Sequence, residues 1–198
     1  MLVFWDERLV FLAVPKTGTT AIEGALAPKA AVVFRDPPIL KHTPLYRYRR
    51  LVEPFLMKAG EVDLDTVAVV RHPVDWLGSW YRYRNRDQLV GQSNSTRGVS
   101  FDDFVDEYCK GNPASFANVG SQAKFLTTGP NQRGITELFR YEQQPLLIQY
   151  LEDRLSTVIE LKQLNVSPQF ETSLSAKTEE KLRRKRPEEF EIWDAAGR

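Results

Sequence analysis

One short segment constrains the fold of this chain more than any other. The apolar residues Leu9 to Val14 are followed at once by the loop Pro15-Lys16-Thr17-Gly18-Thr19-Thr20, and then by residues 21–26, whose apolar positions repeat at helical spacing. A continuous apolar run without alternation is typical of a strand covered on both faces, as in a parallel sheet. The segment therefore predicts a buried strand, a phosphate-type loop and a helix in direct succession.

Similar strand and helix patterns alternate along the rest of the chain. Apolar runs predict further strands at residues 2–4, 31–34, 66–70 and 135–139. Apolar spacing predicts helices at residues 74–86, 101–108, 121–126, around 146–151, 175–186 and 188–196. Strands that alternate with helices indicate one α/β domain over residues 1–198, with a mainly parallel β-sheet flanked by helices.

Charge and composition limit the classes of partner. The chain has 27 basic and 26 acidic residues and a net charge of +1, so nothing draws it as a whole toward nucleic acid or a membrane, and any anion site must be local. The first residues lack a signal-peptide pattern, and no apolar stretch approaches the ~20 residues of a membrane span. Its single cysteine, Cys109, excludes an internal disulfide and a thiolate zinc site. We expect a cytoplasmic protein with no metal site.

The loop has the chemistry of an anion site. A loop at a helix N-terminus presents unpaired backbone N–H groups and the positive end of the helix dipole. Gly18 allows close approach of an anion, Thr19 and Thr20 add hydroxyl groups, and Lys16 adds a positive charge. A nucleoside-triphosphatase loop places its lysine after the second glycine, whereas Lys16 precedes Gly18. The loop is thus suited to phosphate but poorly suited to metal-bound ATP.

In the six residues Pro15 to Thr20 the chain resembles the sulfotransferase family that uses PAPS (3′-phosphoadenosine 5′-phosphosulfate). The 5′-phosphosulfate loop of that family reads P-K-[ST]-G-[ST]-[ST] after the first buried strand.

A second part of the chain resembles the same family. Arg71 ends the strand at residues 67–70 and Ser79 follows eight residues later, as do the arginine and serine with which the family binds the 3′-phosphate. A guanidinium offers a planar fork for phosphate oxygens.

The resemblance implies a P-loop-NTPase-like three-layer sandwich with PAPS as co-substrate, PAP as product and no requirement for metal. The residues that would bind PAPS are Lys16, Thr17, Gly18, Thr19, Thr20, Arg71 and Ser79. Lys16 would also act in catalysis, by neutralising the charge that develops on the oxygen between sulfur and phosphorus. His42 lies between the two phosphate motifs, where many members carry the base that deprotonates the acceptor, and an ordinary histidine pKa near 6.5 suits that role. Glu53 is the alternative base.

Further segments are open to more than one interpretation. Residues 139–142 look like the late strand of the family, which ends in Tyr-Glu, and residues 165–167 show a looser likeness. Ala21 stands where many members carry a tryptophan that stacks on adenine, so the adenine contact is unassigned. Lys41 and the aromatic–basic runs at residues 46–50 and 81–86 could attract an anionic acceptor or could be solvated helix faces.

The function predicted from sequence is transfer of a sulfuryl group from PAPS to a hydroxyl or amine of a small-molecule or carbohydrate acceptor. Two alternatives stay open. One is a small-molecule or nucleotide kinase with a variant phosphate loop, and the other is a nucleotide-binding domain without catalysis. The identity of the acceptor and the oligomeric state are also open.

Overall fold

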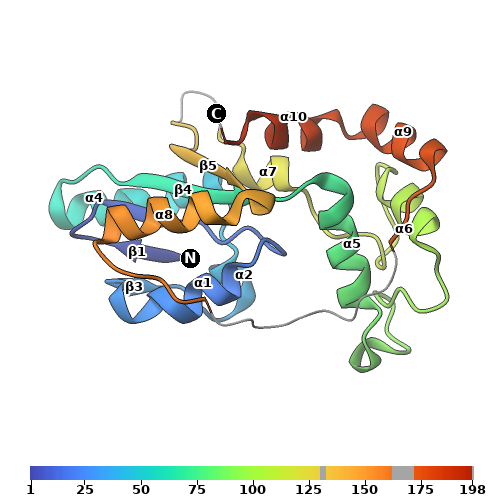
Figure 1. The fold of residues 1–198 in the computed structure, drawn as a ribbon, viewed down its shortest axis with the longest axis horizontal. Coiled ribbons are helices and arrows are strands. Elements are labelled where there is room, and N and C mark those ends of the chain that lie inside the picture. The colour runs from blue at the N-terminus through green and yellow to red at the C-terminus, as the bar shows by residue number, and fades with distance from the viewer. Residues whose placement is uncertain (130–132, 162–171, 198) are drawn as a thin grey trace.

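A five-stranded β-sheet lies at the centre of the molecule, with helices on both of its faces (Figure 1). The computed structural model describes residues 1–129, 133–161 and 172–197, and the segment at 165–167 lies outside them. The strands are β1 (Leu2–Phe4), β2 (Leu9–Phe11), β3 (Val32–Val33), β4 (Asp65–Val70) and β5 (Glu137–Arg140). The α/β class expected from the sequence is therefore confirmed.

The sheet is mixed, and the prediction of a mainly parallel sheet is wrong. Its strand order is β3-β1-β2-β4-β5. β2, β4 and β5 are parallel neighbours, whereas β1 is antiparallel to both β2 and β3. The cause is the tight turn between β1 and β2, which the Arg8 N–H closes by donating to the Trp5 carbonyl at 3.1 Å. A turn this short can join only antiparallel strands, because a parallel pair needs a long crossover.

The predicted helices are present, with ends within a few residues of those expected. They are α1 (Thr19–Leu26), α5 (Pro73–Arg84), α6 (Phe101–Tyr108), α7 (Gln122–Leu126), α8 (Gln144–Leu155), α9 (Ala176–Lys185) and α10 (Pro187–Ala195). The sequence did not predict α2 (Pro38–Lys41), α3 (Leu45–Arg47), the π-helical turn Tyr48–Val52 or α4 (Glu53–Gly60). Prolines precede or occupy the first turn of α2, α3 and α4, a position that proline tolerates without breaking a helix.

Both faces of the sheet are covered, which explains the continuous apolar run after residue 8. Leu9 and Phe11 pack with α1 and α8 on one face. Val10, Leu12 and Val14 pack on the opposite face, against the segment between α3 and α4 and against α7. Since successive side chains of a strand point to opposite faces, a strand covered on both sides has no polar positions.

A third apolar cluster lies beyond the ends of the parallel strands. Its centre is formed by Trp76 of α5, Phe104 of α6, Leu182 of α9 and Phe190 of α10. The helices α5, α6 and α9 lie at one end of the molecule, and α10 runs from there back toward the sheet (Figure 1). The Ser100 hydroxyl caps α6 by accepting from the Asp103 N–H at 3.1 Å. Among the described residues, no helix combines the length and apolarity needed to cross a bilayer.

Candidate active site

The loop between β2 and α1 is tightly curled at the N-terminus of α1. Lys16 and Gly18 both have left-handed backbone conformations, with φ of 68° and 76°. The Thr17 hydroxyl donates to the Val14 carbonyl at 2.9 Å, and the indole N–H of Trp76 donates to the Pro15 carbonyl at 2.9 Å. The predicted succession of strand, loop and helix is confirmed. Turns that include left-handed residues direct successive N–H groups into a concavity that suits an anion.

The threonines of this loop have different surroundings. Thr17 is buried and its hydroxyl braces the loop, so its side chain is not available to a ligand in this structure. Thr19, the first residue of α1, is also buried, whereas Thr20 is exposed. Of the three predicted hydroxyl ligands, Thr20 is the one that is open to solvent.

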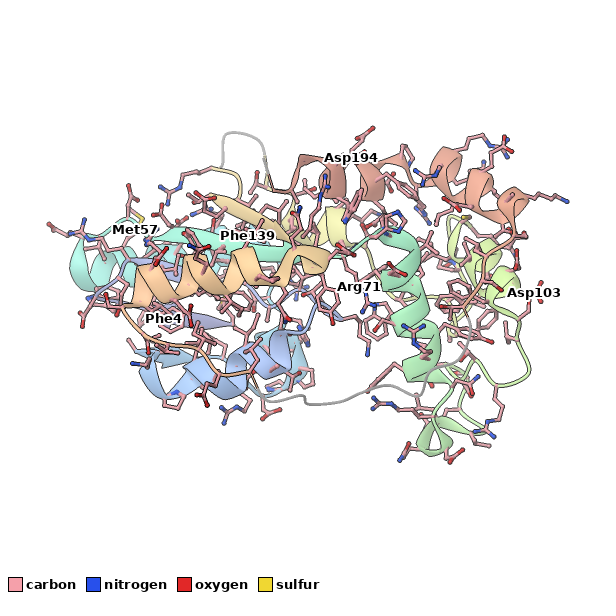
Figure 2. All side chains as sticks on the ribbon, in the orientation of Figure 1. Phe4, Met57, Arg71, Asp103, Phe139 and Asp194 are labelled. Carbon is pink, nitrogen blue, oxygen red and sulfur yellow. The ribbon has the colours of Figure 1, made fainter. Side chains whose placement is uncertain are left out.

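Arg71 follows β4 at the edge where β2, β4 and β5 all end, which we call the carboxyl edge of the sheet (Figure 2). Its guanidinium Cζ lies 4.5 Å from the ring centroid of Tyr141, the residue after β5. The same ring packs on the loop, since a β-carbon added to Gly18 would lie 3.1 Å from Tyr141 Cε2. Tyr141 thus bridges the two predicted phosphate sites. Arg71 Nε is buried and has no hydrogen-bond partner among the described residues.

Lys16 belongs to a cluster of positive side chains. Its Nζ lies 3.9 Å from the ring centroid of Tyr83. Burial, followed by the positive charges of Arg86, Arg71 and Arg82, lowers the pKa of Lys16 to about 8. Burial and the charge of Arg71 likewise lower the pKa of Arg82. We call Lys16, Arg71, Arg82 and Arg86 the cationic cluster. Like charges held this close repel one another, and a bound anion would relieve that cost.

Sequence reasoning assigned Arg71 and Lys16 to a site but left Arg82 and Arg86 as optional surface charges. Ser79, which is largely buried, lies on α5 three residues before Arg82 and four before Tyr83. Residues at these spacings share one face of a helix, so the position of Ser79 was a signal that could have placed Arg82 at the site. In the other aromatic–basic run, at residues 46–50, Tyr48 and Arg49 are buried, so these two side chains do not belong to a solvated helix face.

The His42 imidazole is oriented by the segment that joins β2 to the loop. Its Nδ1 lies 2.6 Å from the Ala13 carbonyl oxygen. A carbonyl can only accept, so Nδ1–H donates and the neutral ring has an unprotonated Nε2. Burial lowers the pKa of His42, which keeps the ring neutral near pH 7. Ala13 is three residues before Lys16, but no hydrogen bond or ring contact joins the His42 and Lys16 side chains within the described ranges.

Glu53, the alternative base, lies at the opposite edge of the sheet. It pairs with the buried Arg49, which donates from Nη2 to the Thr66 hydroxyl at 3.2 Å. Thr66 is near the start of β4, so about 16 Å of strand separates it from Arg71 at roughly 3.3 Å per residue. This position does not support Glu53 as a base at the carboxyl edge.

Lys41, which could attract an anionic acceptor, forms an ion pair of 2.7 Å with Glu23.

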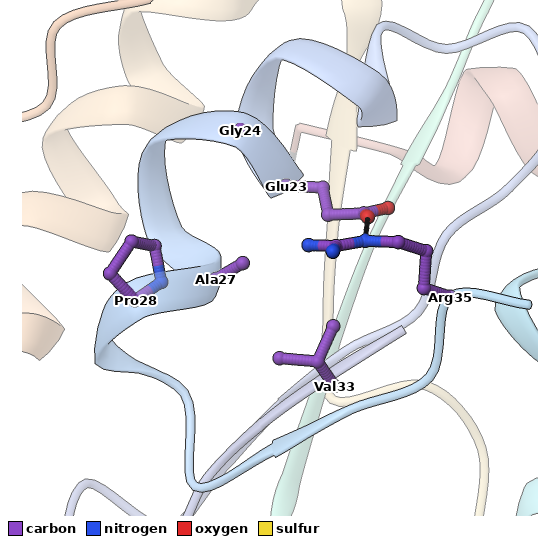
Figure 3. Close-up of a pocket in the computed structure, with 6 residues that line it drawn as sticks. All are labelled: Glu23, Gly24, Ala27, Pro28, Val33 and Arg35. Atoms are coloured by element: carbon purple, nitrogen blue, oxygen red, sulfur yellow. Dashed lines mark hydrogen bonds and ion pairs between the residues drawn. The ribbon is translucent and has the colours of Figure 1, made fainter.

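A separate cavity of about 440 Å³ lies between α1 and β3 (Figure 3). Glu23 and Arg35 form an ion pair of 2.6 Å across it. The lining residues are Glu23, Gly24, Ala27, Pro28, Val33 and Arg35. None of them is a site residue predicted from the sequence, so we place the candidate active site at the cationic cluster rather than in this cavity.

Comparisons with known proteins identify no relative of this chain. No family model matches the chain, and no curated protein or solved structure shows significant similarity to it. The candidate active site combines a curled loop at a helix N-terminus, a cationic cluster at the carboxyl edge and an oriented neutral imidazole.

Proposed function

We propose that the chain is a PAPS-dependent sulfotransferase with a P-loop-like fold. The observation that carries this proposal is that one ring, that of Tyr141, contacts both the loop after β2, at Gly18, and the guanidinium of Arg71 after β4, so the two predicted anion sites are neighbours. A donor with phosphate groups on two carbons of one ribose needs two cationic positions near one another. Ligands of open α/β sheets bind at this edge.

The two ends of the donor would make different contacts. The loop from Lys16 to Thr20 would hold the 5′-phosphosulfate through its N–H groups, and Arg71 with Ser79 would hold the 3′-phosphate. The unpartnered Nε of Arg71 is a donor that a phosphate oxygen could satisfy. Arg82 and Arg86, whose charges also act on Lys16, add to the positive charge of the site.

The transfer step needs a nucleophile, a base and a stabilised leaving group. The acceptor hydroxyl would attack sulfur in line with the bridging oxygen of the donor while His42 Nε2 accepts the hydroxyl proton. The bond between sulfur and that bridging oxygen breaks, and its electron pair leaves with PAP. Lys16 would neutralise the negative charge that develops on PAP. No metal ion takes part in this scheme.

From the sequence alone, we infer a cytoplasmic location for the protein.

The first test is calorimetric titration with PAP and with 5′-AMP, which lacks only the 3′-phosphate, in the absence of magnesium. We expect PAP to bind at least about tenfold more tightly, because each charge-assisted hydrogen bond is worth roughly 1.5–3 kcal/mol. Arg71→Ala should remove the preference for PAP. Arg184→Ala, which removes an exposed cation of α9, should retain it.

The second test is consumption of PAPS in the presence of a panel of hydroxyl and amine acceptors, with Lys16→Ala as the blank. Turnover by the unmodified chain and none by the blank would support the proposal. Equal affinity for PAP and 5′-AMP would rule it out. Magnesium-dependent binding of ATP with phosphoryl transfer would favour a kinase, and PAP binding without any turnover would favour a non-catalytic domain.

A further inference from the structure

The backbone of the Arg71–His72 turn is held by two side chains from distant parts of the chain. Gln122, in the first turn of α7, accepts from the Arg71 N–H through Oε1 and donates to the Arg71 carbonyl through Nε2, both at 2.9 Å. Glu142 accepts from the His72 N–H at 2.7 Å. The direction in which the Arg71 side chain leaves the backbone is therefore set by Gln122 and Glu142.

Both of these residues are held in turn by α10, Gln122 through its backbone and Glu142 through its side chain. Glu189 is 1% exposed and accepts from the backbone N–H of Gln122 at 3.1 Å. Four residues later on the same helix, the indole N–H of Trp193 donates to Glu142 Oε2 at 3.1 Å. The His72 ring packs edge-on against Trp193, with ring centroids 4.9 Å apart. Residues four apart share a helix face, so one face of α10 reaches both supports.

Burial raises the pKa of Glu189, so keeping this carboxyl group in the core has a cost that its hydrogen bonds offset. A buried carboxylate is unfavourable unless its oxygens accept hydrogen bonds. The second oxygen of Glu189 accepts from the Tyr108 hydroxyl at 3.1 Å, and no cation forms an ion pair with Glu189 within the part of the chain that the structure describes. Glu189 accepts from the N–H of the first residue of α7, so its carboxyl group holds the start of that helix in place.

We propose that α10 positions Arg71 for recognition of the 3′-phosphate, with Glu189 and Gln122 as one route and Trp193 and Glu142 as the other. This inference rests on the proposed function, because it assumes that Arg71 binds the 3′-phosphate of the donor. In this role Gln122, Glu189 and Trp193 are positioning residues. They act through the backbone of the Arg71–His72 turn and contact no part of the donor themselves.

The test is the ratio of affinities for PAP and 5′-AMP in Gln122→Met, Glu189→Gln and Trp193→Phe, measured by calorimetry. Gln122→Met keeps the side-chain length but removes both hydrogen bonds to Arg71, and Trp193→Phe keeps an aromatic ring beside His72 but removes the indole N–H. We expect the ratio to fall by about tenfold in Gln122→Met, the size expected when a charge-assisted hydrogen bond is lost, and the affinity for 5′-AMP to change less than twofold. Glu191→Gln, on an exposed position of α10, is the control and should leave the ratio unchanged.

The outcomes separate this inference from the proposed function. If the unmodified chain does not prefer PAP, the proposed function fails. If it prefers PAP and the folded variants retain the full preference with only a lower melting temperature, α10 is merely structural and this inference is overturned. Should Glu189→Gln not fold, the decision rests on Gln122→Met and Trp193→Phe, whose circular dichroism must match that of the unmodified chain.

Discussion

The guanidinium of Arg71 lies over the aromatic ring of Tyr141, with Cζ 4.5 Å from the ring centroid. The two residues follow β4 and β5, neighbouring parallel strands that end at the same edge of the sheet. The ring also packs on Gly18, so one side chain contacts both candidate phosphate positions. The affinity for PAP should therefore depend on Tyr141.

Replacing Tyr141 by leucine should weaken PAP binding about fivefold, because a cation–π contact of this kind is worth about 1 kcal/mol. Tyr141→Phe retains the ring and should bind PAP within about twofold of the unmodified chain. Calorimetric titration of both variants checks this. Equal loss of affinity in the two variants would instead assign the effect to the tyrosine hydroxyl.

Gly18→Ala should lose about 1–2 kcal/mol of stability, because an L-residue is disfavoured in the left-handed conformation, and it should also weaken PAP binding by pushing on Tyr141. Gly98→Ala is the matched control, since Gly98 also has a positive φ, of 81°, but no heavy atom lies within 4 Å of an added β-carbon. Denaturant unfolding should show a similar loss in both variants. Reduced PAP affinity is expected in Gly18→Ala alone, and its appearance in Gly98→Ala would contradict the role of Tyr141.

Binding of PAP should be linked to proton uptake by Lys16. Its pKa is lowered to about 8 in the free protein, and a bound anion favours the charged amine and raises that pKa. The affinity for PAP should therefore fall as the pH rises above about 8, with protons taken up from the buffer in that range. Titrations at about pH 9 in buffers of different ionisation enthalpy measure the uptake. Lys16→Met should abolish it, and proton release in the unmodified chain would be the opposite of this expectation.

The neutral His42 ring should carry its proton on Nδ1 and titrate below the ordinary value of 6.5. Nitrogen-15 NMR of the imidazoles reports both properties, and the chain has only two histidines, so His42→Gln identifies the signal. Turnover of PAPS should vanish in His42→Gln while PAP affinity is unchanged, because the base does not contact the phosphates. A ring protonated on Nε2 would be inconsistent with His42 as the base.

Local patterns were sufficient to predict most of the secondary structure. The continuous apolar residues before Pro15 predicted a strand covered on both faces, and the helix predicted at residues 74–86 is α5, which runs from Pro73 to Arg84. These features depend on periodicity and on capping, which involve residues only a few positions apart. The helices between residues 38 and 60 were missed for two reasons. α2 and α3 are too short to establish a period, and α4, although as long as α1 and α6, buries Leu56 alone, so its apolar positions do not repeat on one face.

The sequence by itself determined most of the strands and helices and where the curled loop lies, because those properties are encoded by neighbouring residues. The tertiary structure alone decided that His42 donates to the Ala13 carbonyl, that Tyr141 lies under Arg71, and that Glu53 is at the far edge of the sheet. It also decided that Glu189 supports Gln122, a contact between residues 67 positions apart. Such contacts follow from how the sheet and helices pack, and no spacing within the sequence records them.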